Sequence, residues 1–254
     1  MATFDFDIGV IGGGAAGLTI TAGAAQLGAK TLLIEKDEAL GGDCLHYGCV
    51  PSKTLIKSAH VYHQMKNADR FGLPLVDLPP VNFRQIAKRI KSVIDTIQQH
   101  DSEQRFCKLG AKVAFGEPHF IDENRLRLNG QTFAAKNWVI ATGSSAVVPP
   151  IPGLAETPHL SNREIFCLDR LPSSMIILGA GPIGVEMGQA FKRLGTRVTI
   201  VDRANQILGK EDRDMADAVK GVMSAEGVVF YLEASIESVA DLGQRKRVAI
   251  KTVD

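Results

Sequence analysis

The sequence lacks long apolar runs and any excess of charge of one sign. With 29 basic and 28 acidic residues, its formal net charge is +1, so it lacks the basic surface typical of proteins that bind nucleic acid. No apolar run reaches the length of a transmembrane helix. Residues 1–6 contain no basic segment ahead of an apolar one, so no secretory signal is predicted. We therefore expect a cytoplasmic protein with no nucleic-acid partner and no membrane segment.

Cysteine is also scarce, with four in 254 residues, too few for a disulfide scaffold in a chain of this size. In the cytosol a close cysteine pair is more often catalytic or metal-binding than structural. Cys44 and Cys49 form such a pair. Cys107 and Cys167 are isolated in the sequence, and we expect them to behave as small apolar residues.

What the sequence does have is apolar content, 45% of residues, enough for one large domain or two ordinary ones. Short apolar runs at 7–12 and 30–35 predict buried strands, and the stretch 15–27 between them has helical composition. This order predicts a parallel sheet with a right-handed crossover. A strand at 174–178, a helix at 182–194 and a strand at 197–202 repeat the pattern.

The segment between these two units predicts two helices. Pro51 suits the first helical position of a helix at 51–66. Apolar residues recur with a period of 3.6 over 83–108, which predicts one longer helix. Lys88, Arg89 and Lys91 lie on its other face, and a solvated surface explains them better than a ligand does.

Short strands are predicted from residue 112 onward. The runs 125–128 and 131–133 flank Asn129 and Gly130, a strong hairpin signal. A further strand is predicted at 138–143. The stretch 147–153 carries three prolines within five residues, which resist both helix and central strand, so it is the best linker candidate.

A glycine motif follows the first predicted strand and opens the first predicted helix: Gly12, Gly13, Gly14, Ala15, Ala16 and Gly17. Gly12 permits a tight turn, Gly14 lets a pyrophosphate approach the backbone, and Gly17 lets helix and strand pack closely. The helix start offers amides and the positive end of its dipole to phosphates. Glu35 ends the second strand, 23 residues after Gly12, where it can accept hydrogen bonds from ribose hydroxyls. The motif predicts a dinucleotide site; the alternative is a glycine-rich turn without a ligand.

A second glycine motif lies between the strand and the helix of the second unit: Gly179, Ala180, Gly181, Pro182, Ile183 and Gly184. Asp202 ends the next strand, again 23 residues after the first glycine. Its carboxylate favours NAD over NADP, although the neighbouring Arg203 weakens that preference. Two motifs indicate two dinucleotides, or one site that has decayed. They predict an α/β protein with two Rossmann-like dinucleotide-binding domains, at 1–150 with a small β-meander and at 151–254.

The cysteine pair belongs to a thirteen-residue motif from Gly41 to Lys53. A loop or a first helical turn can bring Cys44 and Cys49 within disulfide reach. Cys49 precedes a predicted helix start, and Lys53 lies in its first turn, two features that lower a thiol pKa. The alternatives are a structural disulfide or half of a zinc site. Zinc needs further ligands that the sequence does not supply, so no metal is predicted.

This motif resembles the redox motif of the pyridine nucleotide-disulfide oxidoreductases, the family of dihydrolipoamide dehydrogenase, glutathione reductase and mercuric reductase. The resemblance extends over both glycine motifs and the segment from Ala141 to Ser144. The variant here, with Asp43 and Val50, is most similar to mercuric reductase-like members.

The resemblance implies an electron path. The first motif would bind FAD and the second NAD or NADP, and electrons would pass from the nicotinamide through the flavin to a Cys44–Cys49 disulfide. Cys49 would be the thiolate beside the flavin, and Cys44 the thiol that meets substrate. Lys53 would stabilise reduced flavin while Glu186 holds it in place. The implied flavin pocket also includes Ala15, Ala16, Lys36, Gly41, Gly42, Asp43, Pro118, Ala141, Thr142, Gly143 and Ser144. The implied nicotinamide pocket comprises Gly179, Gly181, Pro182, Ile183, Gly184, Asp202 and Arg203.

The resemblance leaves the electron acceptor open among small disulfides, a metal ion and quinones. It implies a homodimer for the full-length protein, and we expect this chain to end within the nicotinamide domain. Several family members have a gating tyrosine where this chain has Pro182. A fragment acting only as a flavin-binding or assembly module is the alternative. The six histidines are expected at surface or packing positions, with one hypothesis kept: His46, between the cysteines, could tune their acidity.

Overall fold

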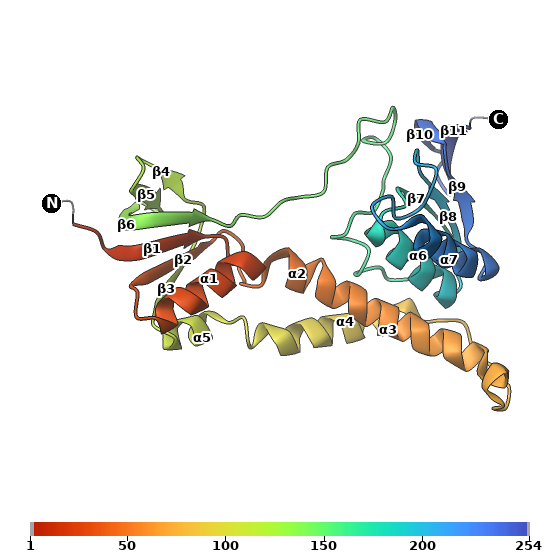
Figure 1. Cartoon of the computed structure of the whole chain (residues 1–254), viewed down its shortest axis with the longest axis horizontal. Coiled ribbons are helices and arrows are strands. Elements are labelled where there is room, and N and C mark those ends of the chain that lie inside the picture. The colour runs from red at the N-terminus through yellow and green to blue at the C-terminus, as the bar shows by residue number, and fades with distance from the viewer. Residues whose placement is uncertain (1–2, 253–254) are drawn as a thin grey trace. The chain divides into compact units, whose positions relative to one another are not determined.

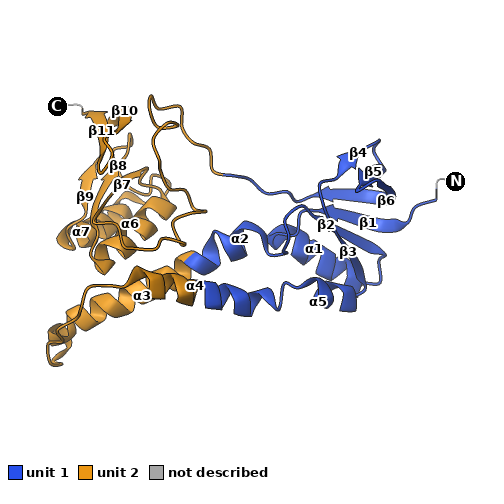
Figure 2. Ribbon diagram, turned by 180° about the vertical axis from the view of Figure 1, so that it is seen from behind, with its two compact units in different colours: residues 1–51, 91–145 blue, residues 52–90, 146–254 orange. Residues whose placement is uncertain are grey.

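The computed structural model describes residues 3–252. By compactness the chain divides into two units, one of residues 1–51 and 91–145 and one of residues 52–90 and 146–254 (Figure 2). The later boundary, between residues 145 and 146, lies just ahead of the proline-rich stretch predicted as a linker. The segment 52–90, expected in the first domain, groups with the second unit. The assignment of cofactor domains to 1–150 and 151–254 stays a prediction, because compactness does not test what each part binds.

The first unit is built on a six-stranded sheet with α1 packed against one face (Figure 1). The strand order is β3-β2-β1-β6-β5-β4. β1 pairs in parallel with β2 and β6, and β2 pairs in parallel with β3, whereas β6, β5 and β4 form an antiparallel meander. The elements are β1 (Phe6–Ile11), α1 (Ala15–Gln26), β2 (Thr31–Glu35), β3 (Ala111–Phe115), β4 (His119–Phe120), β5 (Arg125–Leu128) and β6 (Gln131–Ile140). The predicted α/β class and the β-meander are confirmed.

The core of this unit lies on both faces of β2, which is buried along its whole length. Leu33 packs on one face with Val10, Leu18 of α1 and Phe106, while its neighbours in the strand contribute to a second cluster on the opposite face. A strand covered on both faces needs a continuous apolar run rather than alternation. This is the pattern that the sequence shows at 31–35.

The hairpin prediction is confirmed, but the strand after its turn is longer than expected. Asn129 and Gly130 have φ angles of 49° and 79°, as the turn of a two-residue hairpin requires. The predicted strands at 131–133 and 138–143 are one strand, β6. Its first half pairs with β5 and its second half with β1, so a change of partner, not a break in the strand, separates the two patterns.

The helices around the cysteines differ from the prediction at their starts. A short helix, α2 (Gly42–His46), was not expected, and it carries Cys44. α3 (Cys49–Lys66) begins two residues before Pro51, so Cys49 is its first residue rather than the residue ahead of it. Proline is tolerated there because the backbone amides in the first turn of a helix have no acceptor within the helix, so the amide that proline lacks costs no hydrogen bond. The 3₁₀ turn η1 (Ala68–Phe71) follows α3.

The single helix predicted over 83–108 is two helices, α4 (Phe83–Gln98) and α5 (Glu103–Lys108). Ser102 caps α5 by accepting a hydrogen bond from the Arg105 amide. Serine at this position favours a new helix start over continuation. The apolar period itself is confirmed, because Phe83 and Ile90 are buried and Lys88, Arg89 and Lys91 are exposed.

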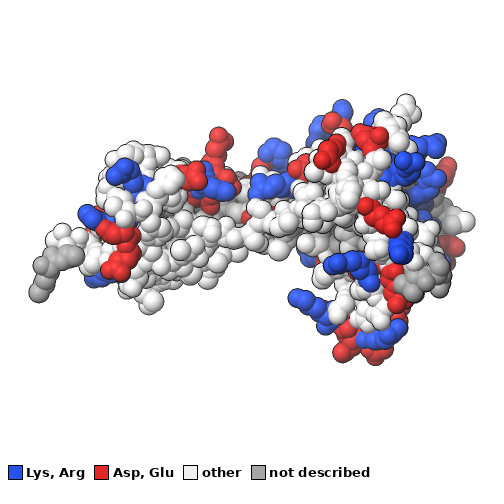
Figure 3. Space-filling model, turned by 90° about the horizontal axis from the view of Figure 1, so that it is seen from above, with Lys and Arg blue, Asp and Glu red and all other residues white. Residues whose placement is uncertain are grey.

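The second unit contains a three-stranded parallel sheet in the order β7-β8-β9 and an antiparallel hairpin of β10 and β11. Its elements are β7 (Ser174–Leu178), α6 (Pro182–Leu194), β8 (Arg197–Val201), α7 (Arg213–Ala225), β9 (Val229–Tyr231), β10 (Ser235–Asp241) and β11 (Lys246–Lys251). The predicted repeat of strand, helix and strand is confirmed. On the face seen in Figure 3, acidic and basic side chains are interspersed.

Candidate active site

The first glycine motif forms a turn in which two glycines are required by the protein's own geometry. Gly12 has a φ of +108°, in the region that glycine favours. A Cβ on Gly17 would lie 1.8 Å from the Gly12 carbonyl oxygen, so only glycine lets α1 start this close to β1. These are the roles that the sequence predicted for them.

Gly14 differs from both neighbours in the motif. Its φ of −86° suits any residue, and the nearest atom that a Cβ would meet, in the described residues, is the Gly42 Cα at 3.7 Å. Nothing in the turn itself therefore requires a glycine here. The open space beside Gly14 fits a ligand that approaches the backbone closely.

The second glycine motif repeats this geometry. Gly179 has a φ of +111°, and a Cβ on Gly184 would lie 2.2 Å from the Gly179 carbonyl oxygen. Gly181 has an ordinary φ of −72°, and its Cβ would meet no atom of residues 3–252 within 4 Å. In each motif the first glycine is required by its positive φ, the last by close packing against the turn, and the glycine at the helix start has open space beside it.

An acidic side chain braces each glycine turn. One Glu35 oxygen accepts a hydrogen bond of 2.6 Å from the Gly13 amide, and the other accepts one from the Asp37 amide. In the same way Asp202 accepts hydrogen bonds from the amides of Ala180, at 2.6 Å, and Ala204. The sequence predicted ribose contacts for both acids and missed this bracing role. A carboxylate has about four acceptor positions, so the brace leaves room for further donors.

The helices that follow the two turns keep their first amides available. For neither α1 nor α6 does a side chain in the described part of the chain cap the N-terminus, and neither first turn holds an acidic residue. Pro182 is the first residue of α6, where its missing amide costs no hydrogen bond. Uncapped amides at a helix N-terminus suit an anion such as a pyrophosphate.

Further predicted residues gather at the carboxyl-terminal edge of the first sheet, where β1, β2, β3 and β6 all end. Ala141 donates its amide to Ile11, and its carbonyl oxygen lies against Gly12. Gly116, two residues before Pro118, donates to the Glu35 carbonyl. Lys36, Thr142, Gly143 and Ser144 are exposed beyond this edge.

The cysteine segment interlocks with the glycine turn. The Gly41 amide donates to the Gly13 carbonyl at 2.8 Å. Gly41 and Gly42 have φ angles of +118° and +60°, and a Cβ on Gly42 would lie 2.6 Å from the Gly14 Cα. Replacing Gly42 would push the two segments apart. α2 and its Cys44 are therefore anchored directly to the first glycine motif.

Cys44 and Cys49 are present as thiols, the first half-buried and the second exposed. Gly48 lets the chain turn between α2 and α3, because a Cβ there would lie only 3.0 Å from the Asp43 carbonyl oxygen and 3.3 Å from the Cys44 Cα. A side-chain hydrogen bond with Cys49 raises the pKa of Cys44 above its ordinary value, and burial and the charge of Cys49 add to the shift. The Cys44 thiol is therefore harder to ionise than an ordinary cysteine thiol.

Lys53 and Glu186 meet as the resemblance implied. The Lys53 Nζ lies 2.6 Å from each carboxylate oxygen of Glu186. Lys53 is in α3, four residues after Cys49, and Glu186 is in the second turn of α6. Both side chains are well exposed, at 61% and 40%.

The remaining predictions concern isolated residues. His46 donates from Nε2 to the Leu40 carbonyl at 3.0 Å, since a carbonyl oxygen can only accept. Cys107 and Cys167 are exposed, so the expectation that they fill apolar sites is wrong. Asp43, Ile183 and Arg203 are exposed. Gln98, whose side-chain amide also donates to the Leu40 carbonyl, was not predicted from the sequence, because the contact joins segments 58 residues apart.

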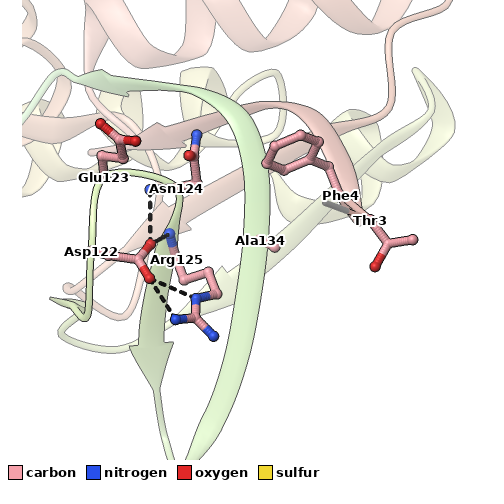
Figure 4. Close-up of a pocket in the computed structure, with 7 residues that line it drawn as sticks. All are labelled: Thr3, Phe4, Asp122, Glu123, Asn124, Arg125 and Ala134. Carbon is pink, nitrogen blue, oxygen red and sulfur yellow. Dashed lines mark hydrogen bonds and ion pairs between the residues drawn. The ribbon is translucent and has the colours of Figure 1, made fainter. Parts of the chain in front are cut away.

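A separate pocket lies at the opposite edge of the first sheet, ahead of β1 (Figure 4). It has a volume of about 490 Å³ and is lined by Thr3, Phe4, Asp122, Glu123, Asn124, Arg125 and Ala134. Asp122 and Arg125, which line it, form an ion pair with each other at 2.6 Å. We do not assign this pocket to the redox chemistry. Within residues 3–252, no cluster of three or more His, Cys, Asp or Glu side chains could hold a metal, and no helix is long and apolar enough to cross a membrane.

These features define an α/β protein with two Rossmann-like units and a cysteine pair beside the first glycine motif. Comparison with known proteins agrees. Residues 6–254 match the family described as "Pyridine nucleotide-disulphide oxidoreductase", and the chain belongs to this family. It is thus related to flavoprotein disulfide reductases.

Three relatives show the extent of the similarity. A mercuric reductase of Bacillus cereus is 32% identical over 252 residues, covering 98% of this chain and 39% of the relative. A dihydrolipoyl dehydrogenase of Acholeplasma laidlawii is 35% identical over 243 residues, covering 93% and 71%. The Cu(II) complex of the HOCl-induced flavoprotein disulfide reductase RclA from Escherichia coli superposes with a TM-score of 0.82 at 30% identity, covering 95% and 52%. The chain thus spans between 39% and 71% of the length of these relatives.

Proposed function

We propose that this chain carries the flavin site, the redox-active cysteines and part of the nicotinamide site of an NAD(P)H-dependent disulfide oxidoreductase. Residues 1–150 would bind FAD and residues 151–254 NAD, with NADP as the less favoured alternative beside Arg203. When bound, FAD would take electrons from the nicotinamide and deliver two of them to a Cys44–Cys49 disulfide. Cytoplasmic location and a homodimeric full-length protein belong to the same proposal.

The observation that carries this proposal is the interlocking of the glycine turn with the cysteine segment. Gly41 is hydrogen-bonded to Gly13, and Gly42 packs against Gly14. A ligand held at the open side of Gly14 would therefore lie in the same compact unit as the thiols. The FAD fit is supported by the open middle glycine, the uncapped start of α1 and the buried acid at Glu35.

The chain's own residues would divide the work. Cys49, at the start of α3, would hold the thiolate, while Cys44 would keep its proton at rest, release it to a base and then attack the acceptor as the exchanging thiolate. Lys53, held by Glu186, would place a positive charge where reduction adds negative charge. The acceptor is a small disulfide, a metal ion or a quinone; the names of the relatives, mercuric reductase and dihydrolipoyl dehydrogenase, support the first two classes.

The test is anaerobic reduction of the purified chain after loading with FAD. One equivalent of dithionite should produce a long-wavelength thiolate–flavin absorption band. Cys49→Ser should abolish the band, and Cys44→Ser should retain it. Bound FAD without this band in the unsubstituted chain would refute the redox pair. Failure to bind FAD, with normal folding by circular dichroism, would refute the flavin site itself.

Gly14→Ala and Gly17→Ala provide a matched pair for the flavin site. Gly14→Ala adds a methyl group into open space, so it should weaken FAD binding and leave the melting temperature nearly unchanged. Gly17→Ala forces a clash with Gly12, so it should destabilise the fold even without FAD. Equal loss of stability in both variants would contradict a ligand-facing role for Gly14.

A further inference from the structure

One backbone carbonyl next to the cysteine motif binds two side chains from different parts of the first unit. The Leu40 carbonyl accepts hydrogen bonds from His46 Nε2 at 3.0 Å and from Gln98 Nε2 at 2.9 Å. Gln98 also donates to the Asp101 carbonyl at 3.1 Å. Both partners of the Gln98 amide are acceptors, so its nitrogen must face them. His46 must likewise carry its proton on Nε2.

The Leu40 carbonyl lies immediately before the turn that leads into α2. Leu40 itself is anchored, with its side chain 1% exposed. Gly41 and Gly42 follow with positive φ angles, and α2 then runs only from Gly42 to His46. So short a helix cannot stabilise itself through its own backbone hydrogen bonds. Its geometry depends on what holds its two ends.

His46 ties these two ends together. It is the last residue of α2, and its ring reaches back to Leu40, two residues before the helix begins. Cys44 lies between them, two residues before His46. Gln98, at the end of α4, fixes the same carbonyl from outside the motif. The Gly41 amide, next in the chain, is held by Gly13.

We propose that His46 and Gln98 are positioning residues for Cys44, acting through the Leu40 carbonyl. They hold α2 in the orientation in which Cys44 meets Cys49. This rests on the proposed function only in taking Cys44 as the exchanging thiol. It also gives a route by which His46 could tune the acidity of the cysteines, because its Nε2–H group is bound to the backbone carbonyl of Leu40.

The experiment measures the alkylation rate of Cys44 as a function of pH, without FAD. The background carries Cys107→Ser and Cys167→Ser, and peptide mass spectrometry separates Cys44 from Cys49. His46→Phe keeps a ring of similar size but removes the donor. Because this loosens the hydrogen bond between the thiols, Cys44 should ionise at lower pH. Its alkylation near neutral pH should rise about two- to tenfold, the range for loss of one hydrogen bond.

Conservative variants separate positioning from mere stability. His46→Gln places an amide donor near the same point and should restore the pH profile, whereas Gln98→Met should shift it in the direction of His46→Phe. Since both donors share one carbonyl, the double variant should differ from the product of the single effects. His119→Gln, an exposed substitution in β4, is the matched control and should change nothing.

Two results would overturn the proposal. One is an unchanged Cys44 profile in His46→Phe, whether or not the melting temperature falls. The other is strictly multiplicative effects of His46→Phe and Gln98→Met. Neither depends on FAD or an acceptor, so this proposal and the proposed function fail through different measurements.

Discussion

The ammonium group of Lys53 is bound by both carboxylate oxygens of Glu186, each at 2.6 Å, across 133 residues of sequence. Exposed ion pairs of this kind contribute only about 0–1 kcal/mol to stability. The contact therefore contributes little to the free energy of unfolding. It matters more for where the positive charge of Lys53 is held, and this leads to the first prediction.

Glu186→Gln should leave the free energy of unfolding within about 1 kcal/mol of the parent value, because the pair is exposed. In the FAD-loaded chain, however, it should slow flavin reduction by NADH about tenfold, equivalent to roughly 1.4 kcal/mol, since Lys53 loses its orienting partner. Stopped-flow absorbance measures this rate. Asp95→Asn, which breaks the exposed Lys91–Asp95 pair at 3.0 Å, is the control and should have no effect. An unaltered rate in Glu186→Gln would remove Lys53 from the proposed chemistry.

Cys44 should react with alkylating agents only above the pH at which an ordinary cysteine does. Its pKa is raised chiefly by the hydrogen bond with Cys49, which the thiol loses when it gives up its proton. Cys49→Ala should shift the half-maximal pH of alkylation downward, and Cys49→Ser should shift it less, because serine keeps a hydrogen-bonding group. If the Cys49→Ala profile moves upward or stays in place, the assigned hydrogen bond is not the cause.

Gly184 and Gly181, two of the three glycines of the second motif, should respond differently to substitution by alanine. Gly184→Ala places a methyl group 2.2 Å from the Gly179 carbonyl oxygen and should cost about 1–3 kcal/mol of stability, the range for overpacking. Gly181→Ala should leave stability unchanged and weaken NADH binding. Urea unfolding and NADH fluorescence titration measure the two effects. A Gly181→Ala variant that binds NADH normally would point to a decayed second site.

Arg193 and Glu226 form an ion pair that is shielded from solvent, with side chains 16% and 11% exposed and a shortest distance of 2.6 Å. Glu226→Gln removes one charge and leaves the Arg193 guanidinium poorly compensated. We expect a loss of about 3 kcal/mol, the lower end of the range for breaking a buried pair. Arg213→Gln, which breaks an exposed pair with Asp217, should cost far less in the same urea titration.

His63 should make the chain less stable as the pH falls below neutral. Burial lowers its pKa in the folded protein, and the nearby Arg193 adds to this effect. The unfolded chain therefore binds a proton more readily, from about pH 6.5 downward. Stability should be unaffected by His63 above that pH and should fall through the window down to its lowered pKa. His63→Gln should flatten this part of the curve of unfolding free energy against pH; an unchanged slope would show that another group is responsible.

Much of the local structure could be predicted because it depends on short-range patterns. The buried run at 31–35, the Asn129–Gly130 turn and the glycines at 12, 17, 179 and 184 each follow from backbone geometry or burial within one element. The predicted start of α3 and the prediction of one continuous helix past Gln98 were wrong for the same reason. Helix ends depend on capping and on tertiary contacts, and only Ser102 gave a local signal.

The partners of the site residues could be predicted only in part. Lys53 and Glu186 were paired through family resemblance, not through anything in their spacing. The bracing of Gly13 by Glu35 and of Ala180 by Asp202 was missed, because the sequence shows an acid at a strand end but not which donor it faces. Gln98 was missed entirely, since its position in an amphipathic helix is that of an ordinary surface residue.

By itself the sequence determined the two strand–turn–helix units, the cysteine pair and the family to which they point. These features are encoded locally, in glycines, apolar periodicity and a compact motif. The tertiary structure alone decided that the cysteine segment interlocks with the glycine turn and that β6 pairs with β5 along its first half and with β1 along its second. It also decided that the Leu40 carbonyl accepts hydrogen bonds from both His46 and Gln98. Those contacts join residues far apart in the chain, and only the packing of the folded chain fixes which distant donor meets which acceptor.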